Sequence, residues 1–403
     1  MKIAITAIMP KGIYSGGRYH AYIMAECLAH AGNEVTFITN ALPVFYDDFK
    51  NYPSHMEIEI LLTENFNVCP GSNDKYDYVI LAPTHEAGTL FYDRSIRFAL
   101  KSKAKLIMLN FESANWFNSI SPWKKKESKW KQWKNCCKYG CLVLSSAKES
   151  MKYAKQFYID YKKYTRFDYW YPAINSFVAD NISIKEKENR ILIFIRLRDK
   201  HKGTLDIFEI INQKLDGYVL VFISGTEKVG NYFTEKLDDY ANRHGFRYEI
   251  KTMVTDEEKF IELKKAKLVL FPSYFEGYGY PPVEAQYCES LCLVYDLPVL
   301  REVNKSGIIY CEYGNPSDMK KKLEQALTGE FETGEIKENI SGKGNFYKRA
   351  GELNKLLASY LDDDWRNPEA KLMPSNRITL EPLYRKLKEY YLRLGRLING
   401  QAS

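Results

Sequence analysis

The sequence predicts an α/β protein of two doubly wound parallel-sheet domains facing each other across a cleft, with extra helices at the C-terminal end. Short apolar runs alternate with segments of helical periodicity, the pattern of parallel sheets covered on both faces. This alternation occurs twice, over residues 2–145 and again from residue 190, with a polar stretch at 181–189 between the two series. The chain has 403 residues, of which 45% are hydrophobic and 27% charged, enough for two globular domains.

The first series starts with an apolar run at 2–8, followed by a glycine-rich loop at 11–18. Apolar residues then recur at helical spacing over 19–31, and Gly32 favours the end of a helix. Further short apolar runs predict strands at 35–39, 78–82, 105–110 and 141–145.

The second series predicts strands at 191–195, 218–223, 247–250, 268–271, 292–295 and 307–310. We therefore expect an N-terminal domain over 1–172, a C-terminal domain over 173–345, and C-terminal helices over 346–403 that pack back toward the N-terminal domain. The tail contains a predicted helix at 346–361 and a basic amphipathic pattern from Leu383. Ligands of open parallel sheets bind at the carboxyl ends of the strands, so the cleft is the expected site.

Composition restricts the class of protein. A formal net charge of +7 is too small to indicate nucleic acid, although phosphorylated ligands and anionic membrane surfaces stay open. The eight cysteines form no paired CxxC sets, which is typical of reduced thiols in a cytosolic protein. The N-terminus reads as a strand rather than a secretory signal, and no apolar run reaches the roughly 18 residues of a membrane span. We expect a cytoplasmic protein.

The segment from Phe271 to Ala285 is the most informative one. A strand leads into a loop with Glu276, Gly277 and Gly279, and two prolines then begin a helix that carries Glu284. A glycine loop and a helix N-terminus present free backbone amides, which attract a diphosphate. Glu276 can accept hydrogen bonds from sugar hydroxyls, and Glu284 from a ribose. The alternative is a helix start with a dipole-favouring glutamate and an unrelated glutamate upstream.

This segment resembles the ExxxxxxxE signature of the retaining family-4 glycosyltransferases, with Glu276 and Glu284 separated by seven residues. Pro272-Ser273, the segment 297–302 and Gly314-Asn-Pro316 are similar to neighbouring family segments. The resemblance implies a GT-B fold and a nucleotide-sugar donor held by the loop. The expected donor-binding residues of this loop are Gly277, Tyr278, Gly279, Tyr280 and Glu284.

A basic turn follows the first strand of the second series. Five of the seven residues from 196 to 202 are basic or histidine, and charges at the carboxyl end of a strand face the cleft. The resemblance assigns the two cations that stabilise the leaving diphosphate to Arg196 and Lys202, with Arg198 as a rival for the arginine. Ile195 stands where the family often has glycine, so the loop register is open. The alternative is a solvated basic turn.

Several further residues are candidates for the cleft. Gly16 and Gly17 are similar to the family's N-terminal glycine pair, which approaches the donor phosphates or the acceptor. Residues near Met253 are expected to cover the base. His85 and Glu112 each follow a predicted strand and are expected to contact the sugar or the acceptor, although a loop histidine is more often structural.

Two stretches of the sequence are considered as a metal site and as a membrane-binding segment. The aspartates at 362–364 follow no strand, and no other set has ligand spacing, so we expect no metal site and no cofactor. Residues 122–134 contain three tryptophans and six lysines, typical of an interfacial helix on anionic lipid at the inner membrane face. The alternative is a charged surface helix whose tryptophans pack on the domain.

The resemblance implies a retaining transfer of a sugar to a hydroxyl of a glycan or lipid-linked acceptor, in cell-surface polysaccharide or glycolipid synthesis. The leaving phosphate takes the acceptor proton in enzymes of this kind, so no dedicated base is needed. Two alternatives remain: a nucleotide-sugar epimerase, which needs acid and base groups at the sugar, and a catalytically silent subunit that binds a sugar nucleotide.

Overall fold

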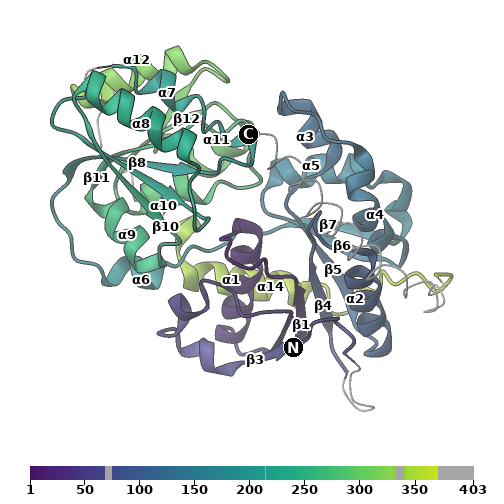
Figure 1. Cartoon of the computed structure of the whole chain (residues 1–403). Helices are drawn as coiled ribbons and strands as arrows, with labels where there is room; N and C mark the ends of the chain where they lie inside the picture. The colour runs from purple at the N-terminus through teal and green to yellow at the C-terminus, as the bar shows by residue number, and fades with distance from the viewer. Residues whose placement is uncertain (69–74, 214, 330, 332–339, 341, 371–403) are drawn as a thin grey trace, which may run out of the picture.

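Two α/β lobes make up the protein, as Figure 1 shows. The computed structural model describes residues 1–68, 75–213, 215–329, 331, 340 and 342–370. Each lobe contains one sheet whose strands all pair in parallel, with helices on both faces. The predicted doubly wound architecture is confirmed.

The N-terminal sheet has seven strands in the order β3-β2-β1-β4-β5-β6-β7. Its strands are β1 (Lys2–Ala7), β2 (Glu34–Thr39), β3 (Ile58–Leu62), β4 (Tyr78–Ala82), β5 (Lys105–Asn110), β6 (Cys141–Ser145) and β7 (Thr165–Tyr169). The helices are α1 (Gly16–His30), α2 (Thr89–Lys101), α3 (Ala114–Ile120), α4 (Lys131–Lys138) and α5 (Lys148–Phe157), with short 3₁₀ turns η1 (Tyr46–Phe49), η2 (Pro53–Glu57), η3 (Glu127–Trp130) and η4 (Ile159–Tyr164).

The C-terminal sheet has six strands in the order β10-β9-β8-β11-β12-β13. They are β8 (Glu188–Ile195), β9 (Val219–Ser224), β10 (Arg247–Thr252), β11 (Ala266–Phe271), β12 (Leu291–Tyr295) and β13 (Ile309–Cys311). The helices are α6 (Ser176–Asn181), α7 (Ile207–Ile210), α8 (Asn231–His244), α9 (Asp256–Lys265), α10 (Tyr280–Tyr287), α11 (Pro298–Asn304) and α12 (Pro316–Leu327), with the turn η5 (Lys200–Lys202).

The sequence patterns located every central strand and missed the two strands at one lobe's edges. β3 and β7 are the outer strands of the N-terminal sheet, and most of their residues are exposed or half-buried. An edge strand lacks the continuous apolar run that marks a strand buried on both faces. The mixed sequence of β7, TRFDY, therefore does not predict a strand by this pattern.

Helix α14 (Phe346–Ser359) returns to the N-terminal lobe, where it packs beside α1 (Figure 1). Phe346, Leu353 and Leu357 are buried in the same core as β1 and α1. Trp365 is also buried there, and its indole N–H donates to the carbonyl of Leu106 at 3.1 Å. The basic tail pattern from Leu383 lies outside the described residues.

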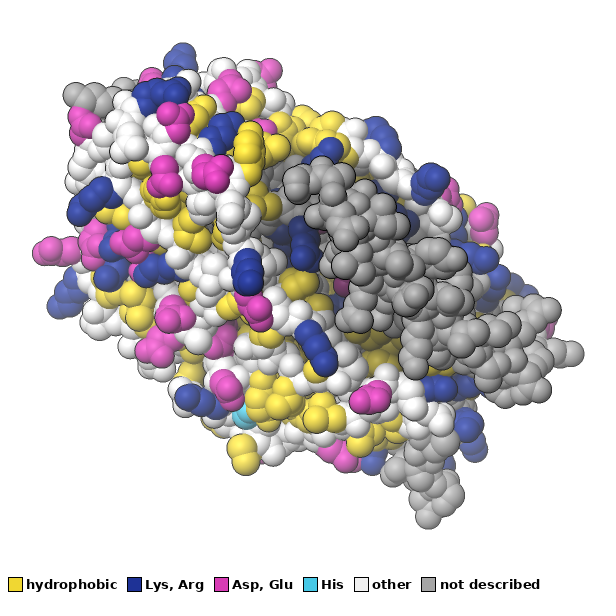
Figure 2. Space-filling model, viewed as in Figure 1, with side chains coloured by type: hydrophobic (Ala, Val, Ile, Leu, Met, Phe, Trp, Pro, Cys, Tyr) yellow, Lys and Arg dark blue, Asp and Glu magenta, His cyan; other side chains and the backbone are white. Residues whose placement is uncertain are grey.

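No helix in the described part of the chain is long and apolar enough to cross a bilayer. The seven described cysteines are all free and buried. On the face drawn in Figure 2, Lys and Arg side chains are spread over both lobes rather than gathered in one patch.

Candidate active site

A cavity of about 480 Å³ lies between the two lobes, at the carboxyl ends of β1, β4, β5, β8 and β11. Every residue proposed from the sequence except Arg198 lines it: Gly16, Gly17, His85, Glu112, Arg196, Lys202, Met253, Glu276, Gly277, Tyr278, Gly279, Tyr280 and Glu284. The fold thus brings predicted site residues that are up to 268 positions apart in the chain (16 to 284) to a single cavity.

The loop between β11 and α10 forms the C-terminal wall of the cavity. Gly279 is the N-cap of α10 with φ 89°, a left-handed conformation that favours glycine. A Cβ there would also lie 2.6 Å from a methyl group of Leu300. Proline occupies the first turn of α10. The loop therefore presents the start of an eight-residue helix to the cavity.

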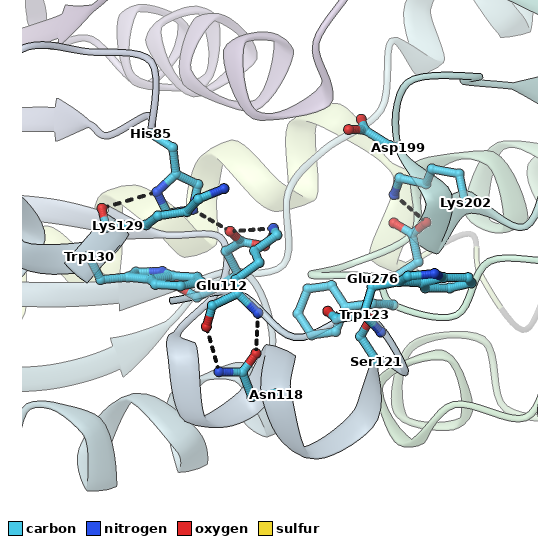
Figure 3. Close-up of polar contacts among 12 residues, drawn as sticks. His85, Glu112, Asn118, Ser121, Trp123, Lys129, Trp130, Asp199, Lys202 and Glu276 are labelled. Carbon is cyan, nitrogen blue, oxygen red and sulfur yellow. Dashed lines mark hydrogen bonds and ion pairs between the residues drawn. The ribbon is translucent and has the colours of Figure 1, made fainter. Parts of the chain in front are cut away.

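Lys202 and Glu276 form an ion pair across this wall. The Lys202 Nζ donates to Glu276 Oε1 at 2.7 Å, and both side chains are mostly buried (Figure 3). Gly203 makes the approach possible, because it has φ 63° and a Cβ would lie 1.8 Å from the carbonyl oxygen of Pro272. His201 also lines the cavity, and burial followed by the charge of Lys202 lowers its pKa to about 2, so it is neutral.

The structure separates the two candidate arginines. Arg196 lines the cavity, and its guanidinium donates to the Tyr14 carbonyl of the opposite lobe at 3.0 Å and to Asp199 at 3.4 Å. Arg198 is exposed and does not line the cavity, so the geometry favours Arg196, and a donor contact of Arg198 stays a prediction. Leu197 between them is 40% exposed, which shows that the chain turns outward there after β8.

Glu284 lies in the cavity wall with a partner that the sequence analysis missed. Its Oε1 accepts from Lys259 at 2.7 Å, and Lys259 also donates to Asp256 at 2.7 Å. Burial alone would lower the pKa of Lys259, but the carboxylates of Asp256 and Glu284 raise it above its usual range. Asp256 accepts from the Tyr19 hydroxyl of the other lobe at 3.0 Å. The four side chains connect the two lobes at the cavity wall, where Lys259 and Glu284 are both lining residues.

Part of this network, the pair of Asp256 and Lys259 on α9, could have been predicted from the sequence. Thr255 and Glu258 form a capping box at the start of α9, which fixes the helix register. Asp256 and Lys259, spaced i and i+3, then lie on one helical face. The pairing with Glu284, 25 positions away, was not predictable from spacing.

On the N-terminal wall, Glu112 is held by two donors. His85 Nε2 lies 2.5 Å and Lys125 Nζ 3.0 Å from its oxygens (Figure 3). Burial raises the pKa of Glu112, but the hydrogen bond from His85 and the charge of Lys125 outweigh it and leave the pKa below its usual value. The His85 loop is anchored by buried Arg18, which donates to the carbonyls of Ala82 and Pro83. Burial lowers the pKa of Arg18 to about 10.

Aromatic and glycine residues complete the lining. The hydroxyls of Tyr278 and Tyr280 are buried and have no hydrogen-bond partner among the described residues. Gly16 and Gly17 are the first two residues of α1, and a Cβ on Gly17 would lie 3.3 Å from the Phe111 ring. Met253 follows β10 with φ 50°, and its N–H donates to Ser224 at 2.9 Å. A side chain at Gly17 would therefore crowd Phe111, which also lines the cavity.

The tryptophans of residues 122–134 do not form a lipid-facing side. Trp130 and Trp133 are 0% and 2% exposed and belong to the core beneath the sheet. Trp123 is 36% exposed and packs edge-on against Tyr274. Residues 122–126 are not helical, so the predicted interfacial helix is wrong and the alternative of packed tryptophans holds. Membrane attachment through the tail stays a prediction outside the described residues.

The aspartates at 362–364 lie away from the cavity. Asp363 pairs with Arg166 at 2.8 Å, and Asp364 with Arg366 at 2.6 Å. Within the described part of the chain, no group of three or more His, Cys, Asp or Glu side chains has the geometry to hold a metal ion.

Two parallel-sheet lobes around a shared cleft define a GT-B protein, and solved structures share this fold. Anabaena HepE in complex with UDP-glucose superimposes with a TM-score of 0.65 at 13% identity, covering 89% of this chain and 100% of HepE. Sucrose-phosphate synthase from Thermosynechococcus elongatus gives a TM-score of 0.67 at 12% identity, covering 89% and 98%.

Comparison of the sequence with known proteins shows similarity to glycosyl transferases within the C-terminal lobe. Residues 177–344, which contain most of the C-terminal lobe, match the family model described as glycosyl transferases group 1. Over 192 residues the chain is 31% identical to the O-antigen chain mannosyltransferase RfbU of Salmonella typhimurium, covering 46% of this chain and 48% of RfbU. The match spans about half the length of that curated relative.

Proposed function

We propose that the protein is a retaining, metal-independent glycosyltransferase that moves a sugar from a nucleotide-sugar donor to a hydroxyl of a glycan or lipid-linked acceptor. The observation that carries the proposal is the convergence of Arg196, Lys202, Glu276 and the start of α10 on one interlobe cavity. The match of the surrounding lobe to glycosyl transferases group 1 supports it.

In this proposal the donor lies against the C-terminal wall. The diphosphate binds the start of α10 and the cations Arg196 and Lys202, which stabilise negative charge as the glycosidic bond breaks. Glu276 then accepts from sugar hydroxyls while its ion pair with Lys202 orients both groups. Glu284 offers the ribose its second carboxylate oxygen, since Oε1 accepts from Lys259. Met253 covers the base.

The acceptor lies against the N-terminal wall, where His85 and Glu112 contact its hydroxyls. The charge of Glu112 is retained because Lys125 and His85 stabilise it. The similarity to RfbU, an O-antigen chain mannosyltransferase, supports a role of this chain in the synthesis of a cell-surface glycan.

The test is a turnover assay over a panel of nucleotide sugars, chosen by thermal shift and including UDP-glucose and nucleotide-activated mannose. We expect release of the nucleoside diphosphate in the presence of EDTA, and a product whose anomeric configuration by NMR equals that of the donor. Isomerised donor without acceptor would instead identify an epimerase. Tight donor binding with no turnover on any acceptor would identify a silent subunit, and loss of activity in EDTA would refute metal independence.

Replacing Gly277 by alanine is expected to lower kcat/KM by about a hundredfold, the cost of an ångström-scale misplacement at a reacting centre. A Cβ at Gly277 would lie 2.4 Å from the Phe111 carbonyl of the opposite lobe, so the two walls could not approach as closely. Gly230→Ala is the matched control, because nothing lies within 4 Å of a Cβ there. Equal kcat/KM in both variants would contradict the idea that catalysis requires the two walls to approach each other as closely as they do in this structure.

A further inference from the structure

A second cavity, of about 630 Å³, lies on the junction between the lobes and is separate from the candidate active site. Its walls come from the end of β7 and the residues after it, the end of α11, and the first turns of α14. None of its lining residues lines the interlobe cavity described above. In Figure 1, α14 passes behind α1, against which it packs.

The lining carries more positive than negative groups. Its four cations are Lys305, Lys343, Lys348 and Arg349, against the two carboxylates of Asp168 and Glu352. Asp168 already accepts from the Tyr169 N–H and the Tyr360 hydroxyl. Glu352 pairs with Arg349 and is 45% exposed, so solvent screens its charge. Among the described residues, Lys305 and Lys348 make no ion pair.

Two of the cations are held in place by burial. Arg349 is 4% exposed, and its Nε has no hydrogen-bond partner. Lys343 donates to the carbonyls of Glu302 and Val303 at 2.8 and 2.7 Å, so carbonyl dipoles rather than a carboxylate neutralise it. Burial, followed by the charge of Lys305, lowers the pKa of Lys343 to about 8. Lys343 is thus a buried cation that lies close to the positive charge of Lys305. The electrostatic potential in this cavity is therefore positive, and a bound anion would lower the repulsion between the two lysines.

Lys305 has an unusual backbone conformation, with φ 52° and ψ −124°. A residue with a Cβ rarely adopts it, and such strain persists at functional positions where glycine would otherwise be favoured. Lys305 lines the cavity from this position. Trp170 and two tyrosines, Tyr169 and Tyr171, add aromatic surface to the same lining.

We propose that this junction cavity is a binding site for the phosphate group of a small soluble metabolite, held by Lys305, Lys348 and the buried Arg349. The cations line one hollow of about 630 Å³, and the aromatic rings suit a sugar carried by the phosphate. A ligand here contacts both lobes and therefore stabilises their closed arrangement by mass action.

The experiment titrates the full-length protein with inorganic phosphate and, separately, with a hexose phosphate, by calorimetry. The Lys202→Ala background removes the principal competing cation in the active site. We expect Lys348→Ala and Lys305→Gly, each in that background, to weaken binding about tenfold, the loss of one charge-assisted hydrogen bond. Lys355→Ala, which removes the same charge from an exposed position on α14, should leave the affinity unchanged. Tighter binding of the hexose phosphate identifies a sugar phosphate as the ligand, and equal affinity identifies free phosphate.

The Lys305→Gly variant distinguishes a loss of phosphate binding from a loss of protein stability. Glycine relieves the backbone strain at this position, so the variant should bind phosphate more weakly without being less stable. We expect its midpoint temperature of unfolding without phosphate to rise while its phosphate affinity falls. Affinities in Lys348→Ala and Lys305→Gly equal to that of Lys355→Ala would overturn the proposal. So would the absence of phosphate binding in the Lys202→Ala background, which would place all binding in the active site.

Discussion

Replacing Lys202 by alanine is expected to lower kcat by about 10²–10³, the usual cost of removing a preorganised partner of developing charge. Lys202 lies in the interlobe cavity beside Glu276, where it would contact the leaving phosphate. The effect should be on kcat more than on KM, because negative charge on the phosphate grows in the transition state. The variant also leaves Glu276 without its cation, so part of the loss comes from a misplaced sugar.

Nucleotide release under saturating donor measures this loss, with Lys200→Ala as the control. Lys200 is an exposed lysine of the same turn and does not line the cavity. We expect wild-type kcat and an unchanged midpoint temperature of unfolding in the control. Lys202→Ala should still unfold cooperatively but at a lower midpoint, because Glu276 loses its ion pair. A Lys202→Ala enzyme with a kcat close to that of Lys200→Ala would show that the leaving phosphate is stabilised elsewhere.

The Lys259→Met variant is expected to lose about 3–5 kcal/mol of free energy of unfolding, the cost of breaking a buried ion pair on one side only. Lys259 is 6% exposed and joins Asp256 to Glu284, so its removal leaves two buried carboxylates without their cation. Denaturant unfolding measures the change. Lys265→Met is the matched control on α9: its pair with Glu188 is solvent-exposed, so we expect a loss below about 1 kcal/mol.

The deficit of Lys259→Met should depend on pH with a definite sign. Burial already raises the pKa of Glu284, and without the lysine the attraction that opposes this rise is lost, so the pKa of Glu284 lies further above its unfolded-state value. Groups whose folded pKa is raised contribute stability at low pH and lose it as the pH rises. The variant should therefore recover toward wild type between pH 7 and pH 5. A deficit that is constant over this range would mean that lost packing, rather than unpaired charge, causes it.

Local patterns predicted most of the fold and many of the cavity residues. The buried strands β4, β5 and β6 were predicted with the bounds that the structure has, because a continuous apolar run between turns needs no long-range information. β7 was missed because an edge strand is half-exposed and its sequence is mixed. Glycine loops at strand ends located the cavity, since the carboxyl ends of parallel strands meet at one edge.

The direction of individual side chains was less predictable. Trp130 and Trp133 have a lysine-rich sequence environment typical of a lipid surface, yet both are buried. Arg196 and Arg198 are two residues apart and equally basic, and only the outward turn after β8 separates them. In each case the residue type and its neighbours allow both orientations, and packing against distant elements selects one.

The sequence by itself determined two parallel-sheet lobes, a glycine loop entering a helix, and a cluster of cations and carboxylates at strand ends. These follow from hydrophobic period and backbone freedom, which are local properties. Only the tertiary structure decided that Glu284 pairs with Lys259, that Arg196 rather than Arg198 lines the cavity, and that a second basic cavity forms where α14 meets the residues after β7. Such contacts join groups far apart in the chain, so they exist only once both lobes are packed together.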